Sequence, residues 1–553
     1  MDPEAQSNSS GLEVIERGNQ ALKRGAWEEA RGLFEDALRQ EETPEALEGL
    51  GRACWWLDDV ARVAEARERA YRAYRRRGDA RGAARIALEL AEDALIFRAE
   101  EAVWNGWTER ARRLLADLEP SPEHAVLAVR DAFFAFMLAA DMEAARRSAA
   151  DAIDVAMRFE MFDLEMLARA IDGVARVAEG KVAEGMRILD EATAAATSGE
   201  MHDVELIGNT CCFMIYGCER VRDFSRAAQW CERVREFSER NGLTSLLGVC
   251  RTHYAMVLAF AGAWAEAEAE LVGAAEQLAL RPAQAAEGVA RLGELRRRQG
   301  RHEEALKLFE EVAFLPEAQI GRGLLALDQD DYAEAANLAE RLLRQIPVSD
   351  RMQRVHAYEL VARARAALGD LAAARQALSE VESAADDIGT TEMRAAAAFT
   401  GGAVALASGE ADRARSLLED AIDLYERSRM PYESAEARLL LARTLIALDQ
   451  RDRVEVEAHR AAATFARLGA VHAEKVARKT VAAPTTGKRA GPLTRRELEI
   501  LSLVGDGLSD KVIAERLTIS EHTVHRHISN ILTKLNVPSR AAAAAQAAKL
   551  GLL

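Results

Sequence analysis

The residues best suited to contact another molecule lie between positions 521 and 535. His525, Arg526 and Ser529 recur there at helical spacing, on a face that carries no acidic residue. Guanidinium groups bind phosphates and guanine edges, and an imidazole can donate to or accept from a base edge. The other face is apolar, with Val524, Ile528, Ile531, Leu532 and Leu535. The spacing therefore predicts a helix with one buried side and one side that could contact nucleic acid.

Two helices are expected before this one. The first starts with the capping box Thr494-x-x-Glu497 and ends at Gly505 and Gly507. The second is short and starts at Ser509, and the side chains that we expect to turn inward on it are Val512, Ile513 and Leu517. A tight turn with Ser520 as the next helix cap then leads into the helix at 521–535. Two helices joined in this way form a helix-turn-helix, whose second helix enters the major groove.

This region resembles the LuxR-type (NarL/GerE-type) DNA-binding domain. The matching residues include Leu493-Thr494, Arg496-Glu497, Gly507, Ser509, Lys511, Ile513-Ala514, Thr523-Val524, His527, Ile531, Lys534-Leu535, Val537 and Arg540-Ala541. The resemblance implies that Lys511, Thr523 and Lys534 contact phosphates. It places His525, Arg526 and Ser529 opposite base edges. The full set of expected DNA-binding residues is Lys511, Ser520, Thr523, His525, Arg526, Ser529, Asn530 and Lys534.

One position departs from the family pattern. The family usually has Lys after Thr-Val, and this chain has His525 there, followed by Arg526. A neutral imidazole attracts phosphate less than a lysine does, whereas Arg526 can read guanine. The operator sequence of relatives therefore does not carry over to this chain.

Other polar residues of this region have simpler interpretations. We expect His527 to pack on the buried side and Arg540 to pair with a first-helix carboxylate such as Glu497. Lys511 has two interpretations, a solvated neighbour of the helix cap and a phosphate contact, and its place at a helix start favours the phosphate contact. The alanine-rich last helix, 539–550, either forms a dimer surface or completes the small domain.

The rest of the chain is rich in helix-forming residues and contains a recurring bend. The bend reads Gly-x-apolar-x-x-Ala, as in Gly25-Trp27-Ala30. Its first residues are Gly25, Gly78, Ala140, Gly180, Arg222, Gly262, Gly300, Asp330, Gly369 and Gly409. The period is near 40, longer than the ~34 of tetratricopeptide repeats, which the array resembles. We expect an all-α solenoid of helix pairs with a concave groove, and an extra helix or insertion in the wider N-terminal gaps.

Composition and charge suggest where the domains begin and end. We expect a disordered N-terminus at 1–12, the array at 13–470, a linker at 471–491 and the helix-turn-helix domain at 492–553. The chain carries a net charge of −17, but the segment from Lys475 onward contains thirteen Lys/Arg and only six Asp/Glu. An acidic body with a basic end is typical of a nucleic-acid-binding module on a separate domain.

No catalytic constellation is visible in the sequence. The Gly-Lys pairs Gly180-Lys181 and Gly487-Lys488 lack the other residues of a phosphate-binding loop. The six cysteines have no Cys-x-x-Cys spacing, so buried packing is a better interpretation than a metal or redox site. We therefore expect no enzyme activity, no cofactor and no metal. Without an apolar run of membrane length or a visible signal peptide, we expect a cytoplasmic protein.

Two functions remain open. In the first, the chain is a transcriptional regulator: the array binds a ligand, peptide or protein, and the C-terminal domain binds double-stranded DNA. A homodimer on DNA, with RNA polymerase as a further partner, goes with this view. In the alternative, the chain is an interaction scaffold or sequestering factor whose C-terminal domain serves protein contacts.

Overall fold

The computed structural model describes residues 3–241, 247–482 and, with single gaps at 506, 518, 520, 536 and 538, residues 495–549. In these residues there are 29 helices and no strand. Contacts divide the chain into two compact units. One consists of Met1–Leu445 with Asp452–Thr480, and the other of Ile446–Arg451 with Val481–Leu553. None of the described helices is long and apolar enough to cross a membrane.

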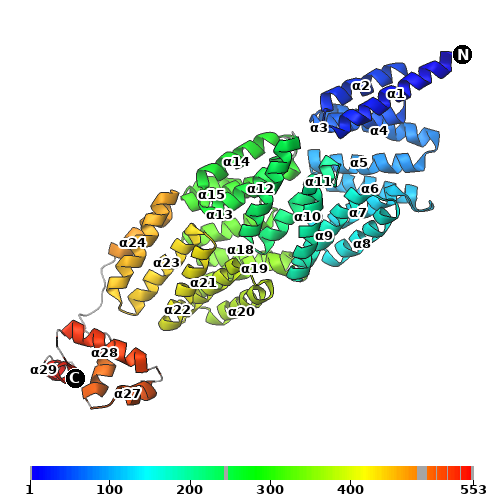
Figure 1. Ribbon diagram of the computed structural model, residues 1–553. Coiled ribbons are helices and arrows are strands. Elements are labelled where there is room, and N and C mark those ends of the chain that lie inside the picture. Colours follow the sequence, from blue (N-terminus) through cyan, green and yellow to red (C-terminus); the bar gives the residue numbers. More distant parts are fainter. Residues whose placement is uncertain are drawn as a thin grey trace. The chain divides into compact units, whose positions relative to one another are not determined.

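The first unit is an array of antiparallel helix pairs that follow one another along the chain (Figure 1). The first half of the array comprises α1 (Pro3–Lys23), α2 (Trp27–Gln40), α3 (Pro44–Trp56), α4 (Val60–Arg77), α5 (Ala80–Arg98), α6 (Glu101–Leu115), α7 (Pro122–Met137), α8 (Met142–Arg158), α9 (Phe162–Ala178), α10 (Val182–Ser198), α11 (Val204–Arg220) and α12 (Phe224–Asn241). The second half comprises α13 (Leu247–Ala261), α14 (Trp264–Gln277), α15 (Pro282–Gln299), α16 (His302–Glu311), α17 (Pro316–Asp328), α18 (Tyr332–Gln345), α19 (Arg351–Ala367), α20 (Leu371–Ile388), α21 (Thr391–Ala407), α22 (Ala411–Arg427), α23 (Pro431–Ala447), α24 (Arg451–Leu468) and α25 (Val471–Ala482). The predicted all-α array is confirmed.

The bends occur where the sequence predicts them. All ten predicted first residues have a positive φ, and a helix begins two residues after each of them. At Gly369 the amide donates to the carbonyl of Ala366, and the next amide, of Asp370, donates to the carbonyl of Arg365. This pattern satisfies the last carbonyls of a helix through one left-handed residue. The small residue at the sixth position of each bend is buried, as at Ala30 and Ala374.

Each of the two wider N-terminal gaps contains an extra helix, as expected: α3 and α4 lie between α2 and α5, and α6 and α7 between α5 and α8. Asp58 and Ala99 also have positive φ, and α4 and α6 begin two residues after them. These two bends lie within the pairs α3/α4 and α5/α6, whereas Gly78 connects one pair to the next. The repeat is therefore regular from the start of the chain. The sequence pattern missed these bends because the small residue at its sixth position is replaced by Val63 and Trp104.

Small residues set how closely paired helices approach. A Cβ on Gly185 of α10 would lie 2.4 Å from the carbonyl oxygen of Gly173 on α9. A Cβ on Gly49 would lie 2.3 Å from the ring of Phe34, which is fully buried. Because glycine has no side chain, the backbones of Gly173 and Gly185 approach each other closely, and Gly49 leaves room for the Phe34 ring.

Segments far apart in the sequence contact one another within the first unit. The Arg220 guanidinium donates to the Asp350 carboxylate at 2.6 Å, and the Thr390 hydroxyl donates to the carbonyl of Val221 at 2.8 Å. Arg281 likewise donates to Asp58 at 2.9 Å, across 223 residues. The array therefore folds back on itself, and helices that are several repeats apart share a common interior.

The two ends of the array differ from expectation. Helix α1 begins at Pro3, within the residues 1–12 that we expected to be disordered. Helix α25 covers the first part of the expected linker at 471–491. This helix packs on the array, since Ala477 is fully buried in a core that includes Phe465. Residues 483–494 lie outside the described part of the chain.

The second unit contains four helices in its C-terminal part. They are α26 (Arg495–Gly505), α27 (Asp510–Leu517), α28 (Glu521–Leu535) and α29 (Arg540–Lys549). All four contribute to one core, with Ile500 and Leu501 on α26, Ile513 on α27 and Ala543 on α29. The predicted helix at 521–535 has the bounds that the sequence indicated.

Candidate functional site

One side of α28 is held in the small core and thereby orients the other side outward. Val524 and Ile531 are fully buried, Ile528 and Leu535 are nearly so, and Leu532 packs against them. The positions opposite this stripe are exposed: His525, Arg526, Ser529 and Asn530. Since Glu521 is the only acidic residue of α28, at its first turn, the exposed face is neutral to basic. This is the geometry that a recognition helix requires.

The predicted phosphate-contacting lysines differ in their surroundings. Lys511 is exposed near the start of α27. The Lys534 ammonium instead donates to the Glu497 carboxylate at 2.8 Å, and Glu497 is only 3% exposed. Lys534 therefore connects α28 to α26, and a phosphate would have to share its charge with Glu497.

Arg540 does not pair with Glu497 as expected. Its guanidinium donates to the Asp510 carboxylate at 2.9 Å and to the carbonyl oxygen of Leu508 at 2.6 Å. Asp510 also lies 3.7 Å from the His525 ring nitrogen Nδ1. The reason for the difference is that Lys534 already occupies Glu497, while Arg540 at the start of α29 reaches the carboxylate of Asp510 at the start of α27.

Other predictions for this domain have mixed outcomes. The Ser509 hydroxyl accepts from the amide of Val512, which confirms the start of the second helix. Val512 itself is 42% exposed, so its expected inward position is wrong, whereas Ile513 is fully buried. On an eight-residue helix with one buried face, Ile513 and Ala514 fill that face and Val512 falls outside it. Thr494 and Ser520, with their predicted caps, lie outside the described residues.

Comparison with known proteins supports the same assignment for this domain. Residues 491–547 match the GerE family model, described as bacterial regulatory proteins of the luxR family. The C-terminal domain is a luxR-type helix-turn-helix. The match covers α26 to α28 and most of α29.

Two curated relatives are similar to this chain over short stretches of 59 and 51 residues. The chain is 52% identical over 59 residues to the transcriptional regulatory protein DegU of Brevibacillus brevis, covering 11% of this chain and 25% of that protein. It is 59% identical over 51 residues to the nitrate/nitrite response regulator protein NarP of Escherichia coli, covering 9% and 24%. It thus spans about a quarter of the length of these relatives.

Solved structures resemble the array at low sequence identity. The yeast Tom70 structure covers 80% of this chain and 97% of its own, with a TM-score of 0.34 and 14% identity. The Cut9–Hcn1 structure covers 84% and 94%, with a TM-score of 0.43 and 14% identity.

The array also contains a cavity of about 320 Å³. It is lined mainly by the first helices of successive pairs, α11, α13, α15, α17, α19, α21 and α23. Its wall combines apolar residues such as Ala255, Leu324 and Phe399 with many charged ones. The sequence does not indicate these residues as one site, since they come from segments more than 200 residues apart. The one local signal was the run Arg296–Arg298 inside a helical stretch, and all three arginines are buried.

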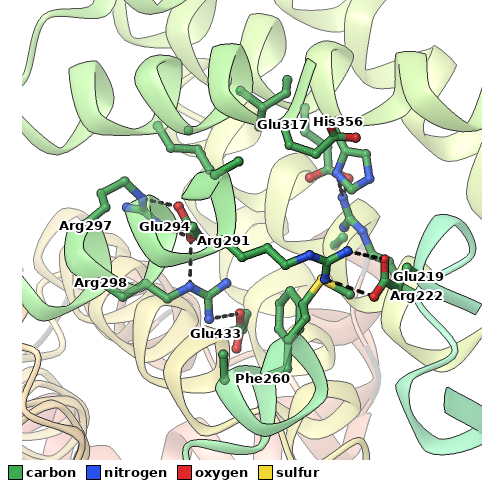
Figure 2. Close-up of a pocket in the computed structure, with 18 of the residues that line it drawn as sticks. Glu219, Arg222, Phe260, Arg291, Glu294, Arg297, Arg298, Glu317, His356 and Glu433 are labelled. Carbon is green, nitrogen blue, oxygen red and sulfur yellow. Dashed lines mark hydrogen bonds and ion pairs between the residues drawn. The ribbon is translucent and has the colours of Figure 1, made fainter. Parts of the chain in front are cut away.

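Arginines of the cavity wall are paired with carboxylates. Figure 2 shows Arg298 between Glu294, at 2.8 Å, and Glu433, at 2.9 Å. Arg222 binds Glu359 at 2.8 Å. Burial acts to raise the pKa of Glu294, but the neighbouring Arg297 and Arg298 hold this pKa at about 2. The wall is therefore a network of ion pairs, each largely removed from water.

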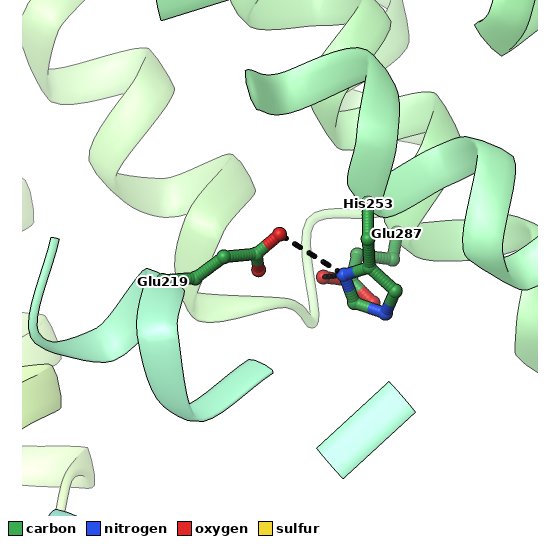
Figure 3. A group of neighbouring side chains, drawn as sticks. All are labelled: Glu219, His253 and Glu287. Atoms are coloured by element: carbon green, nitrogen blue, oxygen red, sulfur yellow. Dashed lines mark hydrogen bonds and ion pairs between the residues drawn. The ribbon is translucent and has the colours of Figure 1, made fainter. Parts of the chain in front are cut away.

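A second cluster beside the cavity has the residue types of a metal site. Glu219, His253 and Glu287 come within ligand distance of one another (Figure 3). The Arg291 guanidinium, however, donates to Glu219 at 2.7 Å and also to Glu287. Burial acts to raise the pKa of Glu219, but Arg291 and His253 hold this pKa at about 2. A guanidinium already supplies the positive charge that a metal ion would bring, so the donor set favours an ion-pair network over a cation site.

The cysteines are mostly buried. All six are free, and Cys212 alone is partly exposed. The Cys212 and Cys250 sulfur atoms lie 3.8 Å apart, and burial raises the pKa of Cys211 and Cys231. Raised thiol pKa values disfavour the reactive thiolate, in keeping with a packing role for these two.

Proposed function

We propose that the chain is a DNA-binding transcriptional regulator, whose array binds a ligand that controls promoter binding by the luxR-type domain. One observation carries the proposal: α28 holds an apolar face in the domain core and presents His525, Arg526, Ser529 and Asn530 outward. The family match at 491–547 supports the same assignment.

The proposed interface divides its contacts between phosphates and bases. Arg526 and His525 lie on the exposed face of α28 and would read base edges, with Ser529 and Asn530 beside them. Lys511 and Thr523, near the starts of α27 and α28, would contact phosphates, as Lys534 and the cap residue Ser520 would in a smaller part. The same face that lacks acidic residues would meet little repulsion from the DNA backbone.

The finer parts of the proposal concern assembly and control. Two copies would bind half-sites about one helical turn apart, since helix-turn-helix dimers place their recognition helices in successive major grooves. The array supplies the cavity in which a small ligand could bind. An acidic body next to a basic domain would also disfavour non-specific DNA binding.

Arg526→Ala tests the DNA-binding proposal. A high-affinity duplex is first selected from a random-sequence pool with the intact protein, and its Kd is measured at fixed salt. We expect Arg526→Ala to weaken binding by about tenfold to a hundredfold, the range of one lost arginine–guanine contact. Arg413→Ala removes an equal charge from an exposed position on the array and is the matched control.

Two outcomes would contradict the proposal. In one, no duplex is enriched by the intact protein at low salt, while the protein still captures a protein partner, as a scaffold would. In the other, Arg526→Ala and Arg413→Ala bind the selected duplex equally well.

A further inference from the structure

The cavity of the array has more acidic than basic side chains in its wall. Nine carboxylates and six arginines line it, an excess of three acids. His356 does not reduce the excess, because burial and the adjacent Arg222 hold its pKa well below the ordinary value. The cavity therefore has a deficit of positive charge.

Three of the carboxylates account for this excess of acidic groups. Glu317, Glu392 and Glu436 line the cavity, and none of them has an ion-pair partner among the described residues. Glu392 is 6% exposed, and its carboxylate accepts hydrogen bonds from the Ser428 hydroxyl and from its own backbone amide. Burial raises the pKa of all three, that of Glu436 to about 7. An unpaired carboxylate in such a site is most stable when a cation is brought to it.

The arginines of the wall do not make the cavity an anion site. Arg220, Arg222, Arg291, Arg297 and Arg298 each pair with at least one carboxylate. The sixth, Arg363, lies over the Phe399 ring with its guanidinium carbon 5.1 Å from the centroid. At the first five arginines an entering anion would have to compete with carboxylates that are already in place.

The apolar part of the wall indicates the rest of the ligand. Ala255, Ala259 and Leu324 face the cavity, together with the aromatic rings of Phe260 and Phe399. One face of each ring already holds a guanidinium, Arg298 on Phe260 at 4.7 Å and Arg363 on Phe399, and the Phe260 ring also stacks on Phe224 at 4.1 Å. The rings therefore add apolar surface to the wall, which suits a cation with an apolar body.

We infer that the cavity binds a small organic cation with an apolar body, through carboxylates that the arginines leave unmatched. This inference rests on the proposed function, of which it names the ligand class. It concerns the array alone and does not depend on the luxR-type domain.

The test measures binding of three probes of similar shape to the full chain by titration calorimetry at pH 8. The probes are phenethylamine, its neutral analogue phenethyl alcohol and the anion phenylpropanoate. We expect the amine to bind and the other two to bind at least tenfold more weakly. The double substitution Glu317→Gln, Glu436→Gln should weaken amine binding at least tenfold, whereas Glu303→Gln, at an exposed position on α16, should leave it unchanged.

Each possible result of these titrations either supports or overturns the inference. Equal binding of amine and alcohol, tighter binding of the anion, unchanged affinity in the double variant, or no amine binding at millimolar concentration would each overturn the inference. A thermal melt of the double variant shows whether it is folded. Since no DNA is present in this assay, its failure leaves the Arg526→Ala test of DNA binding unaffected.

Discussion

At the scale of single residues, charge pairing separates structural from functional groups. Lys534 and Arg540 are basic residues of the luxR-type domain, yet both bind carboxylates of that domain. His525 and Arg526 lie on its exposed face. In the array the contrast is the same: Arg291 binds two acids, whereas Glu436 has no ion pair within the part of the chain that the structure describes. A residue's type alone does not decide its role; its neighbours do.

Glu436→Gln gives a prediction at this scale. Burial raises the folded-state pKa of Glu436 to about 7, and the neighbouring carboxylates Asp328 and Glu433 act in the same direction, whereas Arg363 and Arg297 act to lower it. A carboxyl with a raised folded pKa destabilises the fold increasingly as pH rises from its unfolded pKa to its folded one. The neutral glutamine avoids this cost. We expect the variant to be more stable by about 1–2 kcal/mol above pH 7, because one pKa unit corresponds to about 1.4 kcal/mol and partial solvent access reduces the effect.

Thermal unfolding at a series of pH values measures this difference. The gain should disappear near pH 4.5, the unperturbed value for a glutamate, where the wild-type carboxyl becomes protonated in both states. A variant that is less stable than the wild type at pH 8 would show that the ionised carboxylate is needed by its neighbours.

At the scale of elements, the bends and the close helix contacts define each repeat. A left-handed residue ends one helix, the next helix begins two residues later, and a small buried residue follows in its first turn. Glycine is the usual left-handed residue, but Asp58, Ala99 and Ala140 adopt the same conformation. The surrounding packing thus imposes a backbone geometry that an L-residue adopts only at a cost of about 1–2 kcal/mol.

Gly185→Ala tests the close approach of α9 and α10. A Cβ at this position would meet backbone atoms, the oxygen of Gly173 at 2.4 Å and the amide nitrogen of Val177 at 2.9 Å. Backbone cannot rotate away as a side chain can, so the pair must separate. We expect a loss of about 2–4 kcal/mol in the free energy of unfolding. Gly32→Ala, at a half-buried position of α2 where a Cβ would meet nothing within 4 Å, is the control and should be neutral or slightly stabilising.

Denaturant unfolding of both variants gives the comparison. Equal stability of Gly185→Ala and Gly32→Ala would mean that the α9/α10 pair is looser than this geometry indicates.

At the scale of the array as a whole, contacts between distant repeats create the interior that contains the cavity. Arg220 on α11 binds Asp350, the cap residue of α19, and Asp350 is fully buried. Arg281 binds Asp58 and lies over the Trp55 ring at 4.1 Å. These contacts link parts of the array that a repeat-by-repeat solenoid would leave independent.

Arg220→Ala tests this linkage. It leaves the buried Asp350 carboxylate without its guanidinium, a change that typically costs about 3–5 kcal/mol. We expect a marked fall in stability and faster amide exchange in both α11 and α19. The control is Arg235→Ala, which removes an exposed arginine from α12 and should change stability little. If exchange rises in α11 alone, the two segments are not coupled as proposed.

The sequence by itself determined the local elements. Ten bends were predicted, each has a left-handed residue, and α28 has the predicted bounds and buried stripe. These features depend on residues within one turn of helix or one bend, where φ preference and apolar periodicity act locally. The missed bends at Asp58 and Ala99 show the limit of this signal, since packing overrode the local preference there.

Only the tertiary structure decided the pairing of charges and the position of the cavity. Lys534 rather than Arg540 binds Glu497, and Arg220 binds a carboxylate 130 residues away. The carboxylate that an arginine or lysine binds depends on how helices from distant repeats pack. Sequence spacing contains no information on the distance between side chains of different repeats. The unmatched carboxylates Glu317, Glu392 and Glu436 come together for the same reason, because the array folds back on itself and encloses them in one wall.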